Sequence, residues 1–225
     1  MHVFYDLPCF YHTIVTNIVM YNSIREDLST RQESVTGLCA RIKQKRRLKN
    51  VKYTALLRGI NVGGKNKVEM KRLKDIFASL DCSNVSTYIN SGNVFFESDQ
   101  IRDRLHEKIM DSLSNEYGFQ IPLLIKTHQE IRRIADAIPL NWKNDSEQKT
   151  DVAFLFPEID FEETADRLPV KKEFIDLKYV EGAIIWNVKR EFLNKSQLTK
   201  IIGHPLYQSM TVRNVNTARF LADNM

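Results

Sequence analysis

The chain has 225 residues, of which 43% are hydrophobic and 27% are charged, and its formal net charge is +5. These proportions are ordinary for a globular protein with room for one large core or two small ones. Residues 1–50 hold 8 Lys+Arg against 4 Asp+Glu, so residues 51–225 are nearly neutral. The basic total is therefore no evidence that the main body of the protein binds a polyanion.

The cysteines and the hydropathy of the chain argue against a disulfide-rich, a secreted or a membrane-spanning protein. The three cysteines, Cys9, Cys39 and Cys82, are odd in number and widely spaced, so neither a disulfide framework nor a CxxC metal pair follows. The first residues lack the basic segment of a secretory signal, and the apolar stretch at 10–21 is too short to span a bilayer. We therefore expect a cytoplasmic protein without a membrane partner.

Residues 1–50 form an N-terminal extension that differs from the rest of the chain. Its basic run, Arg41–Lys49, allows three interpretations. The run is a tail for nucleic acid or an acidic surface, or it is a solvated helix or disordered linker. In the third interpretation the extension is not native, and translation starts at Leu48. The regular pattern begins only at Val51.

From residue 51 onward, hydrophobic periodicity predicts a first α+β unit over residues 51–138. Its elements are a strand at 53–57, a helix at 68–80, a hairpin at 84–97, a helix from 101 to about 118 and a strand at 121–125. We expect Asn66 to cap the first helix, with Glu69 three residues on. Thr127 and Glu130 form a capping-box pattern ahead of a further short helix. The order β-α-β-β-α-β is that of a ferredoxin-like unit.

The polar stretch 139–149 is predicted to be a linker. Residues 150–225 repeat the same order of strands and helices less cleanly. The expected elements are a strand at 151–156, a helix from Asp160 to Leu168, a hairpin of 174–180 and 183–188, a helix at 198–202, a strand at 210–213 and a helix at 216–222. The predicted fold is therefore α+β, with two ferredoxin-like units whose antiparallel sheets are covered by helices.

A glycine-rich loop between the first strand and helix is the first candidate site. Residues 58–67 combine Arg58, Asn61, Gly63, Gly64 and Lys65, which suit close approach of backbone N–H groups to an anion. The spacing resembles a phosphate loop, but the Ser or Thr that should follow the lysine is missing and a hairpin comes next. This argues against a phosphate-loop NTPase. A looser anion site and a plain solvated turn both remain open.

Two further polar stretches could contribute to the same site. Ser91 and Asn93 lie in a four-residue hairpin turn, which is also a common sequence for a turn without a ligand. The stretch 211–217 enters the last helix, and its polar side chains suit either an anion or simple N-capping. Its candidate residues are Arg213, Asn214 and Asn216, with Lys195 as an additional cation.

No catalytic or metal-binding pattern is present. The five histidines fall on separate predicted elements without HxxxH or HExxH spacing, and Ser91 is not in a nucleophile elbow. We expect no metal and no cofactor.

At the same motifs the chain resembles a known bacterial family. The motifs are 53–67, 87–94, 195–200 and 211–217, and together they resemble the domain of unknown function 1697 family over about residues 51–222. The family pattern usually has Trp where this chain has Val215. The resemblance implies two ferredoxin-like units in a cytoplasmic bacterial protein, and it implies no activity.

Three hypotheses for function follow. In the leading one, a cleft between the units binds an anionic ligand such as a nucleotide, a phosphate or a nucleic-acid fragment, with nucleic acid the weakest of these. The second is an enzyme that acts on a phosphorylated or nucleotide substrate in the same cleft. The third is a protein-interaction or oligomerisation module without a ligand.

Overall fold

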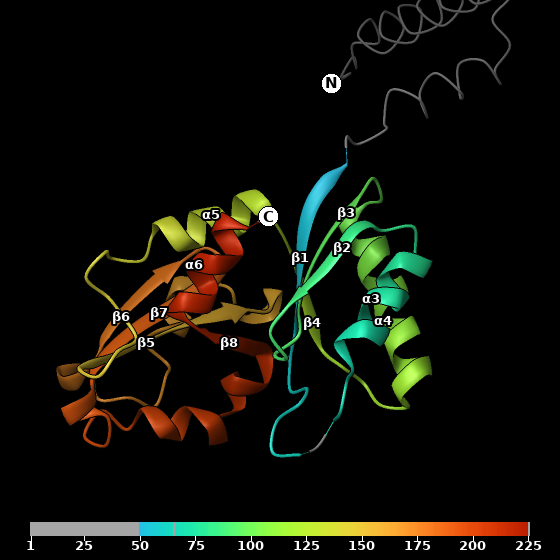
Figure 1. The fold of residues 1–225 in the computed structure, drawn as a ribbon. Coiled ribbons are helices and arrows are strands. Elements are labelled where there is room, and N and C mark those ends of the chain that lie inside the picture. The colour runs from blue at the N-terminus through green and yellow to red at the C-terminus, as the bar shows by residue number, and fades with distance from the viewer. Residues whose placement is uncertain (1–49, 65, 225) are drawn as a thin grey trace, which may run out of the picture. The chain divides into compact units, whose positions relative to one another are not determined.

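The computed structural model describes residues 50–64 and 66–224, and all of these described residues belong to one compact unit. The interpretations of residues 1–50 lie outside the described residues, as does Lys65. The fold is mixed α and β, with two four-stranded antiparallel sheets and helices (Figure 1). No helix among the described residues is long and apolar enough to cross a membrane.

The first sheet is built from the first four strands and carries helices on one face. Its order is β2 (Ser83–Tyr88), β3 (Asn93–Ser98), β1 (Val51–Leu57), β4 (Leu123–Thr127). Helices α3 (Met70–Ser79) and α4 (Arg102–Tyr117) bury Leu73, Phe77, Leu105 and Ile109 against this sheet. Both helices place their apolar side chains three or four residues apart, so each presents one apolar stripe to the sheet.

The second sheet has the same strand order. It runs β6 (Asp176–Val180), β7 (Ala183–Lys189), β5 (Gln148–Leu155), β8 (Met210–Asn214). Helices α5 (His128–Asp136) and α6 (Val215–Asp223) pack on one face, while the other face is covered by short 3-10 turns. The alternating side chains of β5 and β7 are therefore buried on both faces.

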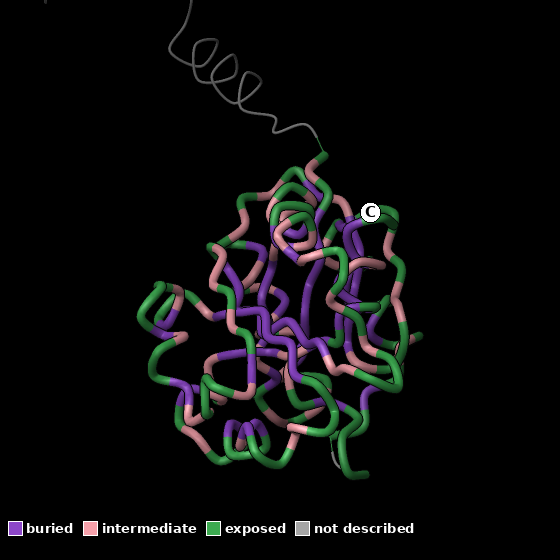
Figure 2. The backbone as a smooth tube through the Cα atoms, turned by 90° about the vertical axis from the view of Figure 1, so that its left-hand side faces the viewer, coloured by how far each residue is buried: buried purple, intermediate pink, exposed green. Residues whose placement is uncertain are grey.

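A shared core joins the two sheets. Leu56, Phe95 and Leu124 from the first sheet pack in one cluster with Val152 and Phe154 from the second, and α5 and α6 add to the same cluster. Figure 2 shows buried backbone running through the centre of this unit. The chain passes from β4 into α5, and this helix packs against both the first sheet and the second in the shared core.

Local signals in the sequence predict several of these elements correctly. Both hairpins form, and α4 ends at Gly118, which adopts the left-handed conformation. The capping box is present, because the Thr127 hydroxyl accepts a bond from the Glu130 N–H at 3.3 Å and the Glu130 carboxylate accepts from the Thr127 N–H at 2.7 Å.

Two capping predictions are wrong. Helix α3 begins at Met70 with Glu69 at the N-cap position, while Asn66 has a φ of +51° and donates to the Gly59 carbonyl at 3.0 Å. Asp160 does not start a helix, because its carboxylate accepts from the Gly182 N–H at 2.8 Å and from the Tyr179 hydroxyl at 3.1 Å. In both cases the side chain that the local pattern assigns to a cap bonds to another part of the chain, seven positions away for Asn66 and 22 positions away for Asp160.

Other elements differ from the prediction in type or in their bounds, and β5 begins at Gln148, inside the stretch predicted as a linker. The segment around Asp160 forms 3-10 turns at Pro157–Ile159, before this residue, and at Glu162–Thr164, after it, in place of a helix. The predicted helix at 198–202 is a 3-10 turn, Leu198–Gly203, in which Ile202 is 64% exposed. Pro205 follows and prevents a longer helix. Strand β4 begins two residues later than expected.

Candidate functional site

Arg213 is the centre of a polar junction between the two sheets. The junction consists of Leu57, Arg58, Ser91, Asn93, Thr211 and Arg213. The Arg213 side chain belongs to β8 but reaches the first sheet, and the residue is only 7% exposed. Its Nε donates to Asn93 Oδ1 at 2.7 Å, and Nη2 donates to the carbonyls of Leu57 and Ser91 at 2.9 and 2.8 Å. The three bonds tie the second sheet to the first.

The remaining donors of Arg213 are used as well. Nη1 donates to the Thr211 hydroxyl and to the Val212 carbonyl, both at 2.9 Å. All five N–H groups of this guanidinium therefore have an acceptor within the protein. Burial lowers the pKa of Arg213 to about 10, so the group is still charged at neutral pH. Every one of its hydrogen-bond acceptors is neutral, and none is a carboxylate.

The hairpin turn of the first sheet is shaped to meet this arginine. Asn93 is fully buried and donates to the Tyr88 carbonyl and the Ser91 hydroxyl, each at 3.0 Å. Gly92 has a φ of +75°, and a Cβ there would lie 2.7 Å from side-chain atoms of Leu57 and Ile60. The turn residues thus serve close packing and hold acceptors in place for Arg213.

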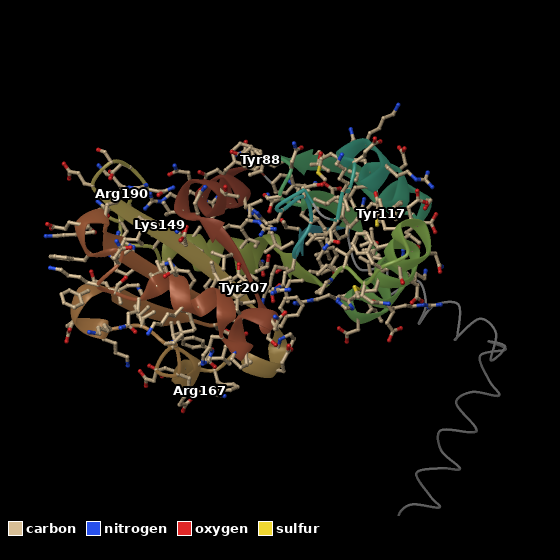
Figure 3. The ribbon with its side chains drawn as sticks, turned by 90° about the horizontal axis from the view of Figure 1, so that it is seen from below. Tyr88, Tyr117, Lys149, Arg167, Arg190 and Tyr207 are labelled. Atoms are coloured by element: carbon tan, nitrogen blue, oxygen red, sulfur yellow. The ribbon has the colours of Figure 1, made fainter. Side chains whose placement is uncertain are left out.

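Arg58 makes a second set of contacts across the junction, with residues at the start of β8 and just before it. Its Nε donates to the Met210 carbonyl at 3.0 Å and its Nη2 donates to Gln208 Oε1 at 3.2 Å. The guanidinium carbon lies 5.3 Å from the centre of the Tyr207 ring, within cation–π range. Tyr207 is labelled where the two halves of the protein meet (Figure 3). The structure therefore brings Arg58, Ser91, Asn93 and Arg213 together.

The glycine loop has a rigid base and an open tip. The Asn61 amide donates to the carbonyls of Val68 and Asn90 at 3.0 Å each, and its Oδ1 accepts from the Val68 N–H at 2.9 Å. At the tip, Gly63 and Gly64 are exposed, with φ of +59° and +76°, and no atom lies within 4 Å of where a Cβ would be. The tip therefore presents backbone to the solvent.

The other predicted site residues lie apart from the junction or have local roles. Lys195 lies 5.4 and 5.9 Å from the ring centres of Phe192 and Phe174 within the second half. Asn214 caps α6 by accepting from the Thr217 N–H at 2.9 Å, as the capping interpretation predicted. Asn216 is exposed in the first turn of α6. Lys65 lies outside the described residues.

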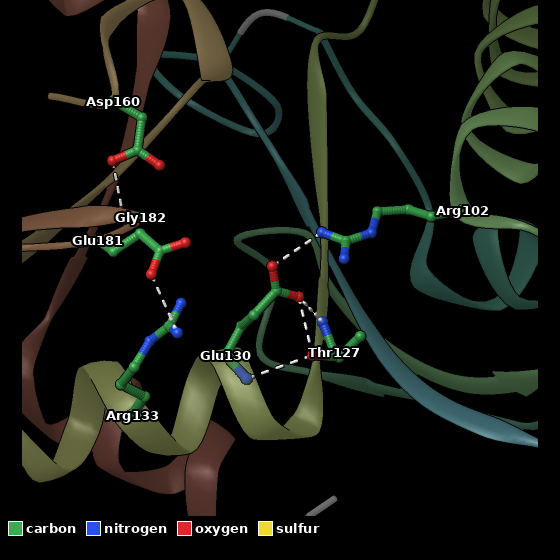
Figure 4. A network of polar contacts seen from close by, with 7 residues as sticks. All are labelled: Arg102, Thr127, Glu130, Arg133, Asp160, Glu181 and Gly182. Carbon is green, nitrogen blue, oxygen red and sulfur yellow. Dashed lines mark hydrogen bonds and ion pairs between the residues drawn. The ribbon is translucent and has the colours of Figure 1, made fainter.

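A charged network that the sequence did not indicate lies where α5 meets the β6–β7 turn (Figure 4). Arg102 pairs with Glu130 at 2.8 Å, and Arg133 pairs with Glu181 at 3.1 Å. Lys126 is half-buried beside this network, and burial lowers its pKa although the nearby carboxylates oppose the shift. The partners come from separate elements, so no local motif could reveal them.

A polar cavity was also missed by sequence reasoning. It measures about 560 Å³ and lies where β5 begins and β7 ends. Gln148 and Asn187 are among the residues that line it, and they come from paired strands. Single polar residues at strand ends carry no pattern in a sequence. Among the described residues, no group of His, Cys, Asp and Glu is placed to hold a metal ion.

Comparison with known proteins places the chain in a family. The sequence model of the family described as "Protein of unknown function (DUF1697)" matches residues 51–186. The chain belongs to this family. A solved structure of the conserved bacterial protein SP0830 from Streptococcus pneumoniae is 28% identical, with a TM-score of 0.68, and the match covers 77% of this chain and 98% of that one. A comparison with curated proteins gave no significant match.

The family match covers the glycine loop and the hairpin turn of this DUF1697 protein, whereas Arg213 lies beyond the matched residues. The junction nevertheless joins all three stretches through hydrogen bonds. What the junction itself does is mechanical: it holds two sheets in one orientation. A ligand site must use groups that the junction leaves free.

Proposed function

We propose that this DUF1697 protein binds a phosphate-bearing anion at the tip of the glycine loop, at Gly63 and Gly64. The observation that carries the proposal is the consecutive left-handed conformation of Gly63 and Gly64. Their N–H groups donate to no acceptor among the described residues. Successive N–H groups in such turns form concave sites for anions. The neighbouring Lys67 is exposed and supplies a positive charge.

The base of the loop supports this proposal because it is held before any ligand arrives. The Asn61 N–H donates to the Asn66 carbonyl at 3.1 Å, and the Asn61 side chain makes three further bonds. A loop that is already ordered loses little conformational entropy when it binds a ligand. The proposed site excludes Arg213 and Asn214, whose hydrogen bonds are used inside the protein.

Calorimetric titration of the full chain with ATP and with tripolyphosphate tests this proposal. We expect saturable binding that weakens as salt concentration rises. Lys67→Ala should weaken binding about tenfold, because a charge-assisted hydrogen bond contributes about 1.5–3 kcal/mol. Lys74→Ala, an exposed lysine on α3, is the matched control and should leave the affinity unchanged. Equal affinities for the parent and Lys67→Ala, or no binding at all, would reject the site.

A second candidate function is protein interaction at the same loops. Val62 is 68% exposed and Ile89 is 49% exposed, and both lie on loops that Asn61 connects through the Asn90 carbonyl. Ile89 also has a φ of +49°, which is unusual for a β-branched residue. Light scattering that shows a stable complex insensitive to salt and phosphate, and lost in Val62→Ser with Ile89→Ser, would favour this function.

We also propose that the two halves are two copies of the ferredoxin-like plan. Each sheet has its first strand between its third and fourth, which supports the idea. The second half departs from the plan because 3-10 turns stand where its two helices are expected.

A further inference from the structure

The cavity at the beginning of β5 is large enough for a small ligand and lies away from the glycine loop. Its volume of about 560 Å³ falls within the range of ligand pockets, roughly 300–1,000 Å³. Gln148 begins β5 and Leu155, which pairs with Met210, ends it, so the cavity is at the opposite end of this strand from the contacts of Arg58. The α5–β5 connection forms one wall through Trp142.

Two amide side chains in this cavity are fixed in orientation by their neighbours. The Thr150 hydroxyl donates to the Lys143 carbonyl at 2.7 Å, so its oxygen must accept from Asn187 Nδ2, also at 2.7 Å. Gln148 Oε1 accepts from the Lys143 N–H at 3.0 Å and from Asn187 Nδ2 at 2.6 Å. These bonds identify which amide atom is nitrogen and which is oxygen.

The same bonds leave one donor and one acceptor free. Among the described residues, Gln148 Nε2 has no acceptor and Asn187 Oδ1 has no donor. Asn187 is only 8% exposed, so its free oxygen belongs to a side chain that is otherwise buried. Asn187 Oδ1 is not among the buried atoms that lack a partner, so it reaches the solvent of the cavity, where water or a ligand can donate to it.

The charge of the cavity disfavours an anion. Three carboxylates line it, Glu147, Asp176 and Glu191, against the two cations Lys189 and Arg190. The Arg190 guanidinium is already used, because it donates to the Asp145 carbonyl at 2.5 Å and to Asn144 Oδ1 at 3.2 Å. A phosphate group would therefore meet net negative charge here.

We propose that this cavity binds a neutral carbohydrate of one or two sugar rings. Sugar hydroxyl groups donate and accept together, which matches the free Gln148 donor, the free Asn187 acceptor and the carboxylates. The indole of Trp142 offers an apolar surface for the C–H face of a ring beside these polar groups. This inference is independent of the proposed anion site.

Tryptophan fluorescence tests the proposal with the full chain. Trp186 is buried and its indole donates to Asp151 at 3.2 Å, so Trp186→Phe leaves Trp142 as the reporter. Titration with glucose, galactose, N-acetylglucosamine, maltose and cellobiose should give a saturable change for at least one sugar. Adenosine and uridine are titrated in parallel.

Gln148→Glu is the decisive variant because it keeps the accepting oxygen and removes the Nε2 donor. It should weaken sugar binding about tenfold, the effect of one lost hydrogen bond. Gln129→Glu, an exposed position on α5, should bind like the parent. If no sugar changes the fluorescence at concentrations up to about 50 mM, near the limit of the weakest binding that can be measured, the proposal is overturned. Saturable binding of a nucleoside alone would overturn it in favour of a heterocycle.

Discussion

The junction around Arg213 and the cavity around Asn187 use buried polar groups in opposite ways. In the junction, a 7% exposed guanidinium satisfies all five of its donors with acceptors from both sheets. In the cavity, an 8% exposed amide keeps a free oxygen. A buried polar group with every bond made contributes to stability, whereas an unpaired atom that reaches the solvent is available for a ligand.

The residues that stand out in the sequence are therefore not the ones with polar atoms free to bind a ligand. The junction draws on the arginines, glycines and asparagines that stand out in the sequence, yet its donors are used inside the protein. The cavity draws on Gln148 and Asn187, which stand out in no motif. We therefore expect substitutions in the junction to affect the free energy of unfolding and substitutions in the cavity to affect binding.

The largest expected effect is that of Arg213→Met. Methionine fills a similar volume but leaves Asn93, Leu57 and Ser91 without their donor, so we expect a loss of about 3–5 kcal/mol in the free energy of unfolding. Urea denaturation followed by circular dichroism measures it. Arg190→Met, at the rim of the cavity, should cost less than about 1 kcal/mol because that guanidinium is exposed. Equal losses for the two variants would remove the distinction between the regions.

A smaller effect is expected from a pair of glycine substitutions. Gly92 and Gly64 have nearly the same φ, +75° and +76°, but a Cβ at Gly92 would lie 2.7 Å from Leu57 whereas the space at Gly64 is open. Gly64→Ala should cost about 1 kcal/mol for backbone strain alone. Gly92→Ala should cost about 1–3 kcal/mol more because of the clash. Thermal denaturation of both variants measures the difference, and a Gly92→Ala protein as stable as Gly64→Ala would show that the junction can relax.

Local signals predicted most of the fold and little of the site. Strand alternation, the Gly118 helix end and the Thr127–Glu130 capping box each depend on residues within a few positions, so the sequence contains their full cause. The predicted cap at Asp160 failed because its partner, the Gly182 N–H, lies 22 positions away. No local pattern in the sequence reveals that these two residues are in contact.

In the candidate site, too, local motifs were predictable from the sequence and contacts between distant residues were not. Three of the motifs that we expected to meet do meet, at Arg58, Asn93 and Arg213, whereas Lys195 lies apart from them. Their proposed ligand role did not follow from their chemistry, since the sequence cannot tell a satisfied arginine from a free one. The cavity depends on the pairing of β5 with β7, which brings Gln148 and Asn187 together from 39 positions apart.

The smallest expected effect concerns Glu130, a half-buried side chain that is neither as buried as Arg213 nor left with a free polar atom in a cavity. Burial tends to raise the pKa of this carboxyl, but hydrogen bonds from the Thr127 N–H and hydroxyl and from Arg102 outweigh burial, so its pKa lies below its usual value of 4.5. A carboxyl whose pKa is lower in the folded state contributes stability above about pH 4.5, and this contribution is lost as pH falls through the folded pKa.

Glu130→Gln should therefore reduce the free energy of unfolding by about 1 kcal/mol at pH 7, the usual size of a helix cap, and the difference should vanish in acid. Urea denaturation at pH 7 and at a series of lower pH values that continues below the folded pKa measures it. Glu107→Gln on the exposed face of α4 should change stability little at either pH. If the Glu130→Gln deficit persists unchanged in acid, the carboxylate charge is not what stabilises the start of α5, and the cap acts through shape and neutral hydrogen bonds alone.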